Sequence, residues 1–244
     1  VWNMHRNLER KVLAKADIVT TITPFYVRHF ERLGNRKVEL LTNGFDSEDF
    51  QSFKAVRGEK FAIRHIGIVN EKCNPRPFLK VLSGMITADP AFGDDVVLEF
   101  VGEVNAGFKN EVSSDMILAA VTKFTGSVPH HELISIYSSS AVLLLILTGY
   151  RDAEGYMPGK LFEYIATGIP VLGVGPPDGD AARLIEENRA GLMASEENAN
   201  EISAFILSAY RRWKEGGSSH VQGEKADRYS RRGVTRRLTE LLGS

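Results

Sequence analysis

The chain has 244 residues, of which 43% are hydrophobic, and it carries a formal net charge of −1 and one cysteine. This length supports a substantial core in one large domain or in one and a half ordinary ones. The near-zero charge gives no general attraction to nucleic acid, and one cysteine excludes an intramolecular disulfide framework. The longest apolar run, residues 141–147, is far shorter than the ~20 residues that span a bilayer.

The N-terminal part predicts a small helix-and-strand unit followed by a linker. Residues 4–15 have a helical pattern, and Thr23-Pro24 opens a second helix that ends near residue 33. Residues 16–23 are interpreted as a buried strand and residues 37–44 as a second strand, which ends at an Asn-Gly pair that readily takes positive φ. The charged, weakly patterned stretch 47–60 is the predicted linker.

Beyond the linker, apolar strands alternate with amphipathic helices. The predicted strands are 61–69, 96–102, 122–126, 141–147 and 170–175. The predicted helices are 75–87, 111–120, 129–139, 158–167 and 180–188, followed by two long helices at 197–214 and 224–242. This alternation is typical of a parallel sheet covered on both faces. The predicted fold class is α/β, with a doubly wound parallel sheet.

Ligands of such sheets bind beyond the carboxyl ends of the strands. The helix predicted at 158–167 follows one of these ends, and its Lys160, Glu163 and Thr167 share one face because they lie three to four residues apart. Its N-terminal N–H groups, near Gly159, and the Lys160 charge suit a phosphate. Glu163 could accept hydrogen bonds from a ribose diol. The alternative is a solvated Lys/Glu face on a surface helix.

Other polar residues have simpler interpretations. No group of His, Cys or Asp has metal-ligand spacing, so we expect no metal ion and no resident cofactor. His65 lies inside a strand pattern and is interpreted as a satisfied core or strand-end histidine. The arginines of 228–237 are interpreted as a solvated helix face, with contact with an anionic membrane surface as the alternative.

The segment PGKLFEYIATGIPVLGVGPP (158–177) is similar to the donor-site segment of retaining glycosyltransferases with the two-domain GT-B fold, the family 4 ("group 1") kind. VELLTNGFDSEDF, IGIVNEKCNP, LEFVGEV and FTGSVPHHELISIYSSSAVLLLI also match in the family's order, so the similarity runs from about residue 8 to 210. It implies a Rossmann-like donor-binding C-terminal domain at 55–223. Residues 1–54 would be the tail of the N-terminal, acceptor-side domain with its linker, and 224–244 a helix that returns toward that domain.

The resemblance also implies roles around a nucleoside-diphosphate-sugar. Glu163 resembles the glutamate that holds the nucleotide ribose, the Ser127–Val128 main chain resembles the loop that meets the base, and the Gly67 loop resembles the backbone against the diphosphate. Asn43 and Gly44 would lie at the interdomain cleft. The full predicted donor-binding set is Asn43, Gly44, Gly67, Lys72, Ser127, Val128, Gly159, Lys160, Leu161 and Glu163.

The sequence departs from the family pattern at two places. The family usually has a glutamate eight residues before the ribose-binding one, in contact with the transferred sugar, and that place holds Gly155 here. Glu154 beside it is the candidate substitute, and the catalytic residue is otherwise unknown. Some members with a Pro-x-Lys-x-x-Glu motif also lack the earlier glutamate.

The second departure concerns the positive charge that faces the diphosphate. The basic residue expected after the Gly67 loop is displaced, since the best-aligned position is Cys73, with Arg64 nearby. Neutralisation of the diphosphate therefore rests on Lys72 or Lys160, and the sequence leaves both open.

The implied activity is transfer of a sugar, with retention, to the hydroxyl of a sugar, a lipid-linked sugar or a small molecule in polysaccharide or glycoconjugate synthesis. The resemblance implies no nucleic-acid partner and a cytoplasmic protein, with the inner face of the membrane as an alternative place. The chain starts with Val1, and most of the acceptor-side domain is missing from it. We therefore expect a donor-binding piece that is inactive alone.

Two alternatives stay open. A non-catalytic nucleotide-sugar-binding module is favoured by the missing glutamate. A nucleotide-sugar epimerase of the same fold would need its own acid and base residues, and the sequence shows no such set. A nicotinamide-dependent dehydrogenase is disfavoured because no Gly-x-Gly-x-x-Gly opens any of the predicted helices.

Overall fold

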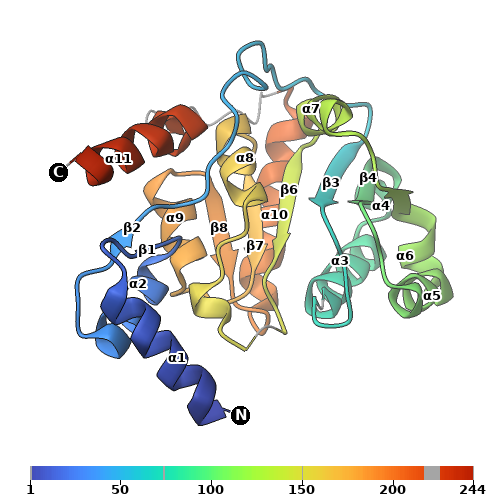
Figure 1. Ribbon diagram of the computed structural model, residues 1–244. Coiled ribbons are helices and arrows are strands. Elements are labelled where there is room, and N and C mark those ends of the chain that lie inside the picture. Colours follow the sequence, from blue (N-terminus) through green and yellow to red (C-terminus); the bar gives the residue numbers. More distant parts are fainter. Residues whose placement is uncertain (1, 74, 150, 217–225, 244) are drawn as a thin grey trace.

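The computed structural model describes residues 2–73, 75–149, 151–216 and 226–243. Its centre is a six-stranded parallel sheet with the order β5-β4-β3-β6-β7-β8 (Figure 1). The strands are β3 (Phe61–Ile66), β4 (Val96–Val101), β5 (Thr122–Gly126), β6 (Val142–Ile146), β7 (Val171–Val174) and β8 (Gly191–Ala194). The strand order reverses between β3 and β6, which makes their carboxyl ends the switch point of a doubly wound sheet. The predicted α/β fold is confirmed.

Helices cover both faces of the sheet. One face packs against α3 (Arg76–Ala88), α4 (Pro90–Asp95), α5 (Ala106–Ser114), α6 (Met116–Val121) and α10 (Ala199–Lys214). The other packs against α7 (His130–Ser138), α8 (Lys160–Thr167) and α9 (Asp180–Glu187). The central strand β6 is buried at every residue because its side chains alternate between the two cores. Each such side chain contributes roughly 1.5–3 kcal/mol.

Two connections on the first of these faces are shaped by helix caps. Asp115 accepts from the N–H groups of Ile117 and Leu118 at 2.9 and 3.0 Å, and it therefore starts a new helix. The single helix predicted at 111–120 is thus wrong, since α5 and α6 occupy this stretch. Asp89 caps the short α4 in the same way, and the sequence analysis missed both α4 and β8.

The N-terminal unit consists of α1 (Trp2–Lys15), α2 (Pro24–Gly34) and the two-stranded sheet of β1 (Thr20–Thr21) and β2 (Glu39–Leu40). Thr23 caps α2 as predicted, accepting from Tyr26 N–H at 3.3 Å. The strands predicted at 16–23 and 37–44 are wrong in extent, and the first is not buried. Ile18 and Ile22 are 39% and 41% exposed because this sheet is a single pair of short strands.

The C-terminal segment lies against residues 39–48. It comprises a 3₁₀ turn, η2 (Ala226–Tyr229), and α11 (Arg231–Gly243). The helix predicted at 224–242 therefore begins later than expected, and residues 224–225 lie outside the described residues. The ion pairs Arg231–Asp46, Arg232–Glu48 and Arg237–Glu39, at 3.2, 2.6 and 3.1 Å, join α11 to the N-terminal segment. Pairs with this much exposure contribute about 0–1 kcal/mol each.

Candidate functional site

The carboxyl ends of β3, β4 and β5 form a closely packed shelf of main chain. Gly67 N–H donates to Val101 O and Gly102 N–H to Gly126 O, both at 2.7 Å. Gly67 and Gly102 have φ values of +129° and +130°, and a Cβ on Gly102 would lie 2.5 Å from Gly67 O. Only glycine fits this backbone. Without side chains at Gly67 and Gly102 the loops after β3 and β4 can approach one another, and main-chain atoms form their outer edge.

Lys160 reaches this shelf across the switch point. Strands β3 and β6 pair only through Ile63–Val142 and Arg64–Leu143, and they diverge toward their carboxyl ends. The Lys160 side chain, from the first residue of α8, extends to Gly67, where a Cβ would lie 2.8 Å from its Nζ. The structure thus brings together two of the predicted donor-site residues.

Lys160 is half-buried, and one imidazole lies within hydrogen-bond distance of its ammonium. Its Nζ lies 3.2 Å from His65 Nε2, and His65 is 0% exposed with its Nδ1 3.0 Å from Leu144 O. Burial lowers the pKa of Lys160 to about 8, while the Cys73 thiol nearby acts in the opposite direction. Burial, and then the Lys160 charge, lower the pKa of His65 well below its ordinary value. His65 is therefore neutral, and its interpretation as a satisfied core histidine agrees with the structure.

Glu163 lies one turn further along α8 and is held by a tyrosine. Its Oε2 accepts from the Tyr137 hydroxyl at 2.7 Å, and Tyr137 is fully buried on α7. Within the described part of the chain Oε1 has no hydrogen bond, so this oxygen is left for an external donor. Thr167, expected on the same face, is instead buried, and its hydroxyl donates to Tyr164 O at 2.6 Å. A solvated Lys/Glu face does not describe this helix.

The other predicted donor-site residues in the α7 and α8 segments differ in how far a ligand could reach them. The space in front of Gly159 is open, since a Cβ there would meet nothing within 4 Å. Leu161 is 0% exposed and its N–H donates to Pro158 O at 3.0 Å, so it faces the core and not the open side of the helix. Ser127 is exposed and Val128 half-buried in the loop that leads into α7, the helix of Tyr137.

The two candidate cations for a diphosphate occupy different places. Lys72 is exposed at the rim of a hollow of about 630 Å³ formed by residues 68–72 and 103–105. Its loop turns because Asn70 Oδ1 accepts from the N–H groups of Lys72 and Cys73 at 2.9 and 3.0 Å. Of the two lysines, Lys160 is therefore the one held against Gly67.

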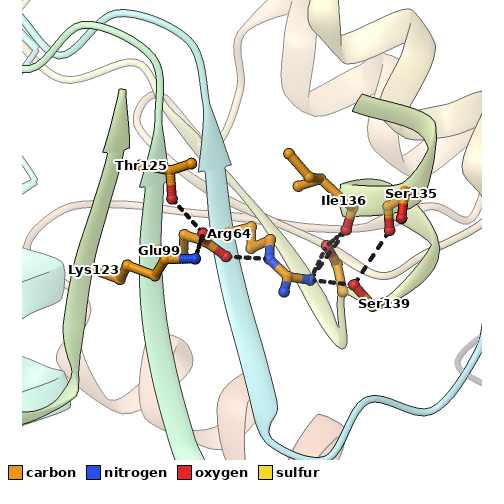
Figure 2. Close-up of polar contacts among 8 residues, drawn as sticks. Arg64, Glu99, Lys123, Thr125, Ser135, Ile136 and Ser139 are labelled. Carbon is orange, nitrogen blue, oxygen red and sulfur yellow. Dashed lines mark hydrogen bonds and ion pairs between the residues drawn. The ribbon is translucent and has the colours of Figure 1, made fainter. Parts of the chain in front are cut away.

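Arg64, which is close to the Gly67 loop in the sequence, belongs to a network of its own (Figure 2). Its Nε donates to Glu99 Oε2 at 2.7 Å and its Nη1 to Ser139 Oγ at 3.1 Å, near the C-terminus of α7. Burial acts against the charge of Glu99, but hydrogen bonds from Arg64, Lys123 and Thr125 lower its pKa to about 2. The charge of Arg64 is thus already paired with Glu99 inside the sheet.

Position 155 has no room for a side chain. A Cβ on Gly155 would lie 2.5 Å from the ring of Phe25, and α2 is fixed there because Phe25 N–H donates to Asp180 Oδ2 at 2.6 Å. Glu154 is exposed and lines a cavity of about 360 Å³ with residues that include Arg151 and Glu197. The glutamate of the resembled family could not replace Gly155 without moving Phe25.

Gly44, which with Asn43 was expected at the interdomain cleft, contacts the C-terminal segment. A Cβ on Gly44 would lie 2.3 Å from Tyr229 O, and the N–H of the next residue, Phe45, donates to the same oxygen at 3.0 Å. Gly44 therefore permits close approach of the C-terminal segment. A larger cavity of about 650 Å³ lies nearby, between β2, α9 and α11, with Pro24 and Arg237 among its lining residues; the sequence analysis did not anticipate it.

The described residues contain neither a metal-ligand group nor a membrane-spanning helix. No three His, Cys, Asp or Glu side chains in ranges 2–73, 75–149, 151–216 and 226–243 are grouped so that they could hold a metal ion. No helix in these ranges is long and apolar enough to cross a membrane.

Comparison with known proteins decides the family. A family model described as "Glycosyl transferases group 1" matches residues 60–212, which is more than half of the chain and includes the sheet, α8 and the glycine shelf. The chain belongs to the group 1 glycosyl transferases. No curated protein sequence matches it.

Solved structures of glycosyltransferases share the fold of this group 1 chain. HepE of Anabaena in complex with UDP has a TM-score of 0.77 at 15% identity, over 100% of this chain and 68% of HepE. TarM of S. aureus has a TM-score of 0.72 at 14% identity, over 98% of this chain and 47% of TarM. Sucrose-phosphate synthase of Thermosynechococcus elongatus has a TM-score of 0.71 at 15% identity, over 98% of this chain and 61% of the synthase. At such identities the likeness shows the fold, which is of the GT-B, Rossmann-like type, and the chain spans only part of each relative.

Proposed function

We propose that this chain is the donor-binding, C-terminal half of a retaining glycosyltransferase that moves a sugar from a nucleoside-diphosphate-sugar to an acceptor hydroxyl. The observation that carries the proposal is the Lys160 ammonium held over the Gly67 main chain at the switch point, with the free oxygen of Glu163 one turn along the same helix. This arrangement offers a cation for the diphosphate and an acceptor for the ribose hydroxyls.

The proposed chemistry is electrostatic. The difficult step is departure of the diphosphate while the anomeric carbon becomes cationic. The Lys160 charge and the N-terminal N–H groups of α8 would stabilise the leaving group, as preorganised charges and dipoles do in other transferases. An oxygen of the donor phosphate could itself take the acceptor proton, so this half needs to supply no dedicated base. We propose that neither a metal ion nor a cofactor takes part.

Recognition of the nucleotide would be divided between α7 and α8. Glu163 would bind the ribose through Oε1 while Tyr137 fixes Oε2, and the main chain of Ser127 and Val128 would meet the base. UDP is the first nucleotide to test, because the HepE complexes contain UDP or UDP-glucose. Lys72, Asn43 and Gly44 stay predicted donor contacts.

We propose that the part of the enzyme that binds the acceptor is not contained in this chain. The chain spans 68% of HepE and 46% of TarM, so the acceptor-binding part of a comparable enzyme would be supplied by further sequence. We propose a sugar, a lipid-linked sugar or a small molecule as acceptor, a role in polysaccharide or glycoconjugate synthesis in the cytoplasm or at the inner membrane face, and no transfer by the chain alone. Sugar transfer by the isolated chain would contradict the last point.

Calorimetric titration with UDP, GDP, ADP and dTDP tests the donor site. We expect saturable binding of one nucleotide, weakened at least about tenfold, or roughly 1.4 kcal/mol, in Glu163→Ala. Glu186→Ala, at an exposed glutamate of α9, is the matched control and should bind as the unaltered protein does. Equal binding by Glu163→Ala and the control would contradict the proposed ribose contact.

A non-catalytic nucleotide-sugar-binding module is the second candidate. Phe25 against Gly155 favours it, because this contact excludes the glutamate that touches the transferred sugar in the resembled family. An assay of the full-length protein for donor hydrolysis and sugar transfer distinguishes the transferase from the binding module. A binding module would bind the nucleotide-sugar and catalyse neither reaction.

A further inference from the structure

We propose that His65 is a positioning residue for the donor diphosphate: its neutral imidazole accepts a hydrogen bond from Lys160 and fixes the ammonium over Gly67. The inference rests on the proposed donor site and deepens it. His65 would not touch the ligand itself, because it is 0% exposed behind Lys160.

The direction of the hydrogen bonds follows from the partners of the ring. Leu144 O, 3.0 Å from Nδ1, is a carbonyl and can only accept, so Nδ1 carries the proton. Nε2 of the neutral ring is then an acceptor, and the atom 3.2 Å from it is the Lys160 ammonium, which can only donate. The Ile68 main chain also contacts the ring and, like Leu144, acts to raise the pKa of His65, but burial outweighs both. The main chain of β6 thus fixes the His65 tautomer in which Nε2 can accept a hydrogen bond from Lys160.

The position of the imidazole follows from the sheet. Strand β3 pairs with β4 along six residues but with β6 along two, so the ladder opens where His65 begins. Its ring replaces the missing β3–β6 hydrogen bond to Leu144 and directs Nε2 toward the carboxyl edge. A lysine side chain loses rotamer entropy when it is fixed. Its bond to a rigid ring allows part of this ordering to precede ligand binding.

The bond also leaves the lysine available to a ligand. One of its three N–H groups is used by His65, and no carboxylate neutralises Lys160 among the ion pairs of the described residues. A neutral acceptor can orient an ammonium without cancelling its charge. Lys160 would therefore present two N–H donors and a full positive charge to the space above Gly67.

Two substitutions isolate the acceptor atom. His65→Phe keeps the ring and removes both nitrogens, whereas His65→Gln keeps an acceptor near the position of Nε2. Both lose the original donor to Leu144, so a general effect on the fold would be similar in the two variants. Thermal unfolding of each variant checks that the protein compared is folded.

The readout is the ratio of affinities for UDP and uridine, measured by titration of the full-length protein. A positioning role through Lys160 changes this ratio, because only UDP carries the diphosphate. We expect His65→Phe to weaken UDP binding by about three- to tenfold, the scale of one hydrogen bond, and to leave uridine binding unchanged. His65→Gln should recover most of the loss. If another nucleoside diphosphate binds instead of UDP, its affinity is compared with that of the corresponding nucleoside.

A double-mutant cycle completes the test. If His65 acts through Lys160, His65→Phe should have no further effect on UDP affinity in a Lys160→Met background. Equal loss of uridine and UDP binding, or full additivity of the two substitutions, would overturn the positioning role while leaving the donor site intact. Absence of nucleoside diphosphate binding by the unaltered full-length protein would overturn the proposed function and this inference with it.

Discussion

Two half-buried cations, Arg64 of β3 and Lys160 of α8, have opposite roles. Arg64 meets a carboxylate, a carbonyl and hydroxyls, and its charge is fully compensated by Glu99 (Figure 2). Lys160, at the carboxyl end of the same strand, meets only a neutral imidazole among its hydrogen-bond partners. The comparison teaches that a compensated cation supports the fold, whereas a cation with a neutral acceptor retains its attraction for an anion.

The largest effect should follow from removing the compensated cation. Arg64→Leu leaves Glu99 buried with Lys123 and Thr125 only, and breaking a buried ion pair costs about 3–5 kcal/mol. We expect a loss of about 3 kcal/mol in the free energy of unfolding, measured with urea. Nucleotide affinity of the folded protein should stay unchanged, and a selective loss of affinity would show that Arg64 serves the site after all.

The same network predicts a response to acid. Because the pKa of Glu99 is lowered to about 2 in the folded protein, its charged form stabilises the fold above the ordinary carboxyl pKa. That contribution should disappear as the pH falls from about 4.5 to 2. Urea unfolding across this range should show a smaller acid-induced loss for Glu99→Gln than for the unaltered protein. An identical loss would contradict the role given to Glu99.

The uncompensated cation predicts a response to base. Lys160 has a pKa lowered to about 8, so its charge is present below that pH and is lost as the pH rises through it. UDP affinity should therefore fall between about pH 7 and 9. Lys160→Arg, which stays charged throughout, should remove this pH dependence even if it binds less tightly at pH 7. A pH profile shared by both proteins would assign the titration to another group.

The smallest effect is expected from the support of Glu163. Tyr137→Phe removes one hydrogen bond to Oε2 and leaves the ring in the core, at a cost of about 1 kcal/mol in stability. We expect UDP affinity to fall by about threefold, less than in Glu163→Ala, because the carboxylate remains but is no longer oriented. An affinity loss as large as that of Glu163→Ala would mean that Tyr137 itself contacts the nucleotide.

Much of the fold was accessible from local sequence. Apolar strands and the Thr23 cap were predicted from residues adjacent in the chain. Strand β8 was missed because it is short and starts at Gly191, which resembles a loop residue, yet a Cβ there would lie 1.9 Å from Val171 O. Its glycine is required by strand packing that only the folded chain shows.

The site was predictable only in part. The resemblance selected Gly67, Lys160 and Glu163, and the structure places Lys160 beside Gly67. The contacts that orient them join residues far apart in the chain: His65 to Lys160, and Tyr137 to Glu163. No periodicity or motif encodes such pairs, and the same holds for Arg64 of β3, whose partner Glu99 lies on β4.

Titration of Lys160→Met with UDP, together with its urea unfolding, tests the central claim most directly. We predict a ten- to hundredfold loss of affinity, the range expected for a charge-assisted hydrogen bond of about 1.5–3 kcal/mol. The loss of stability should be no more than about 1 kcal/mol, because an apolar side chain of similar length replaces a half-buried charge while His65 Nε2 loses one hydrogen bond. Unchanged affinity, or a fall in stability that accounts for the loss of binding, would contradict the assignment of Lys160 to the donor diphosphate.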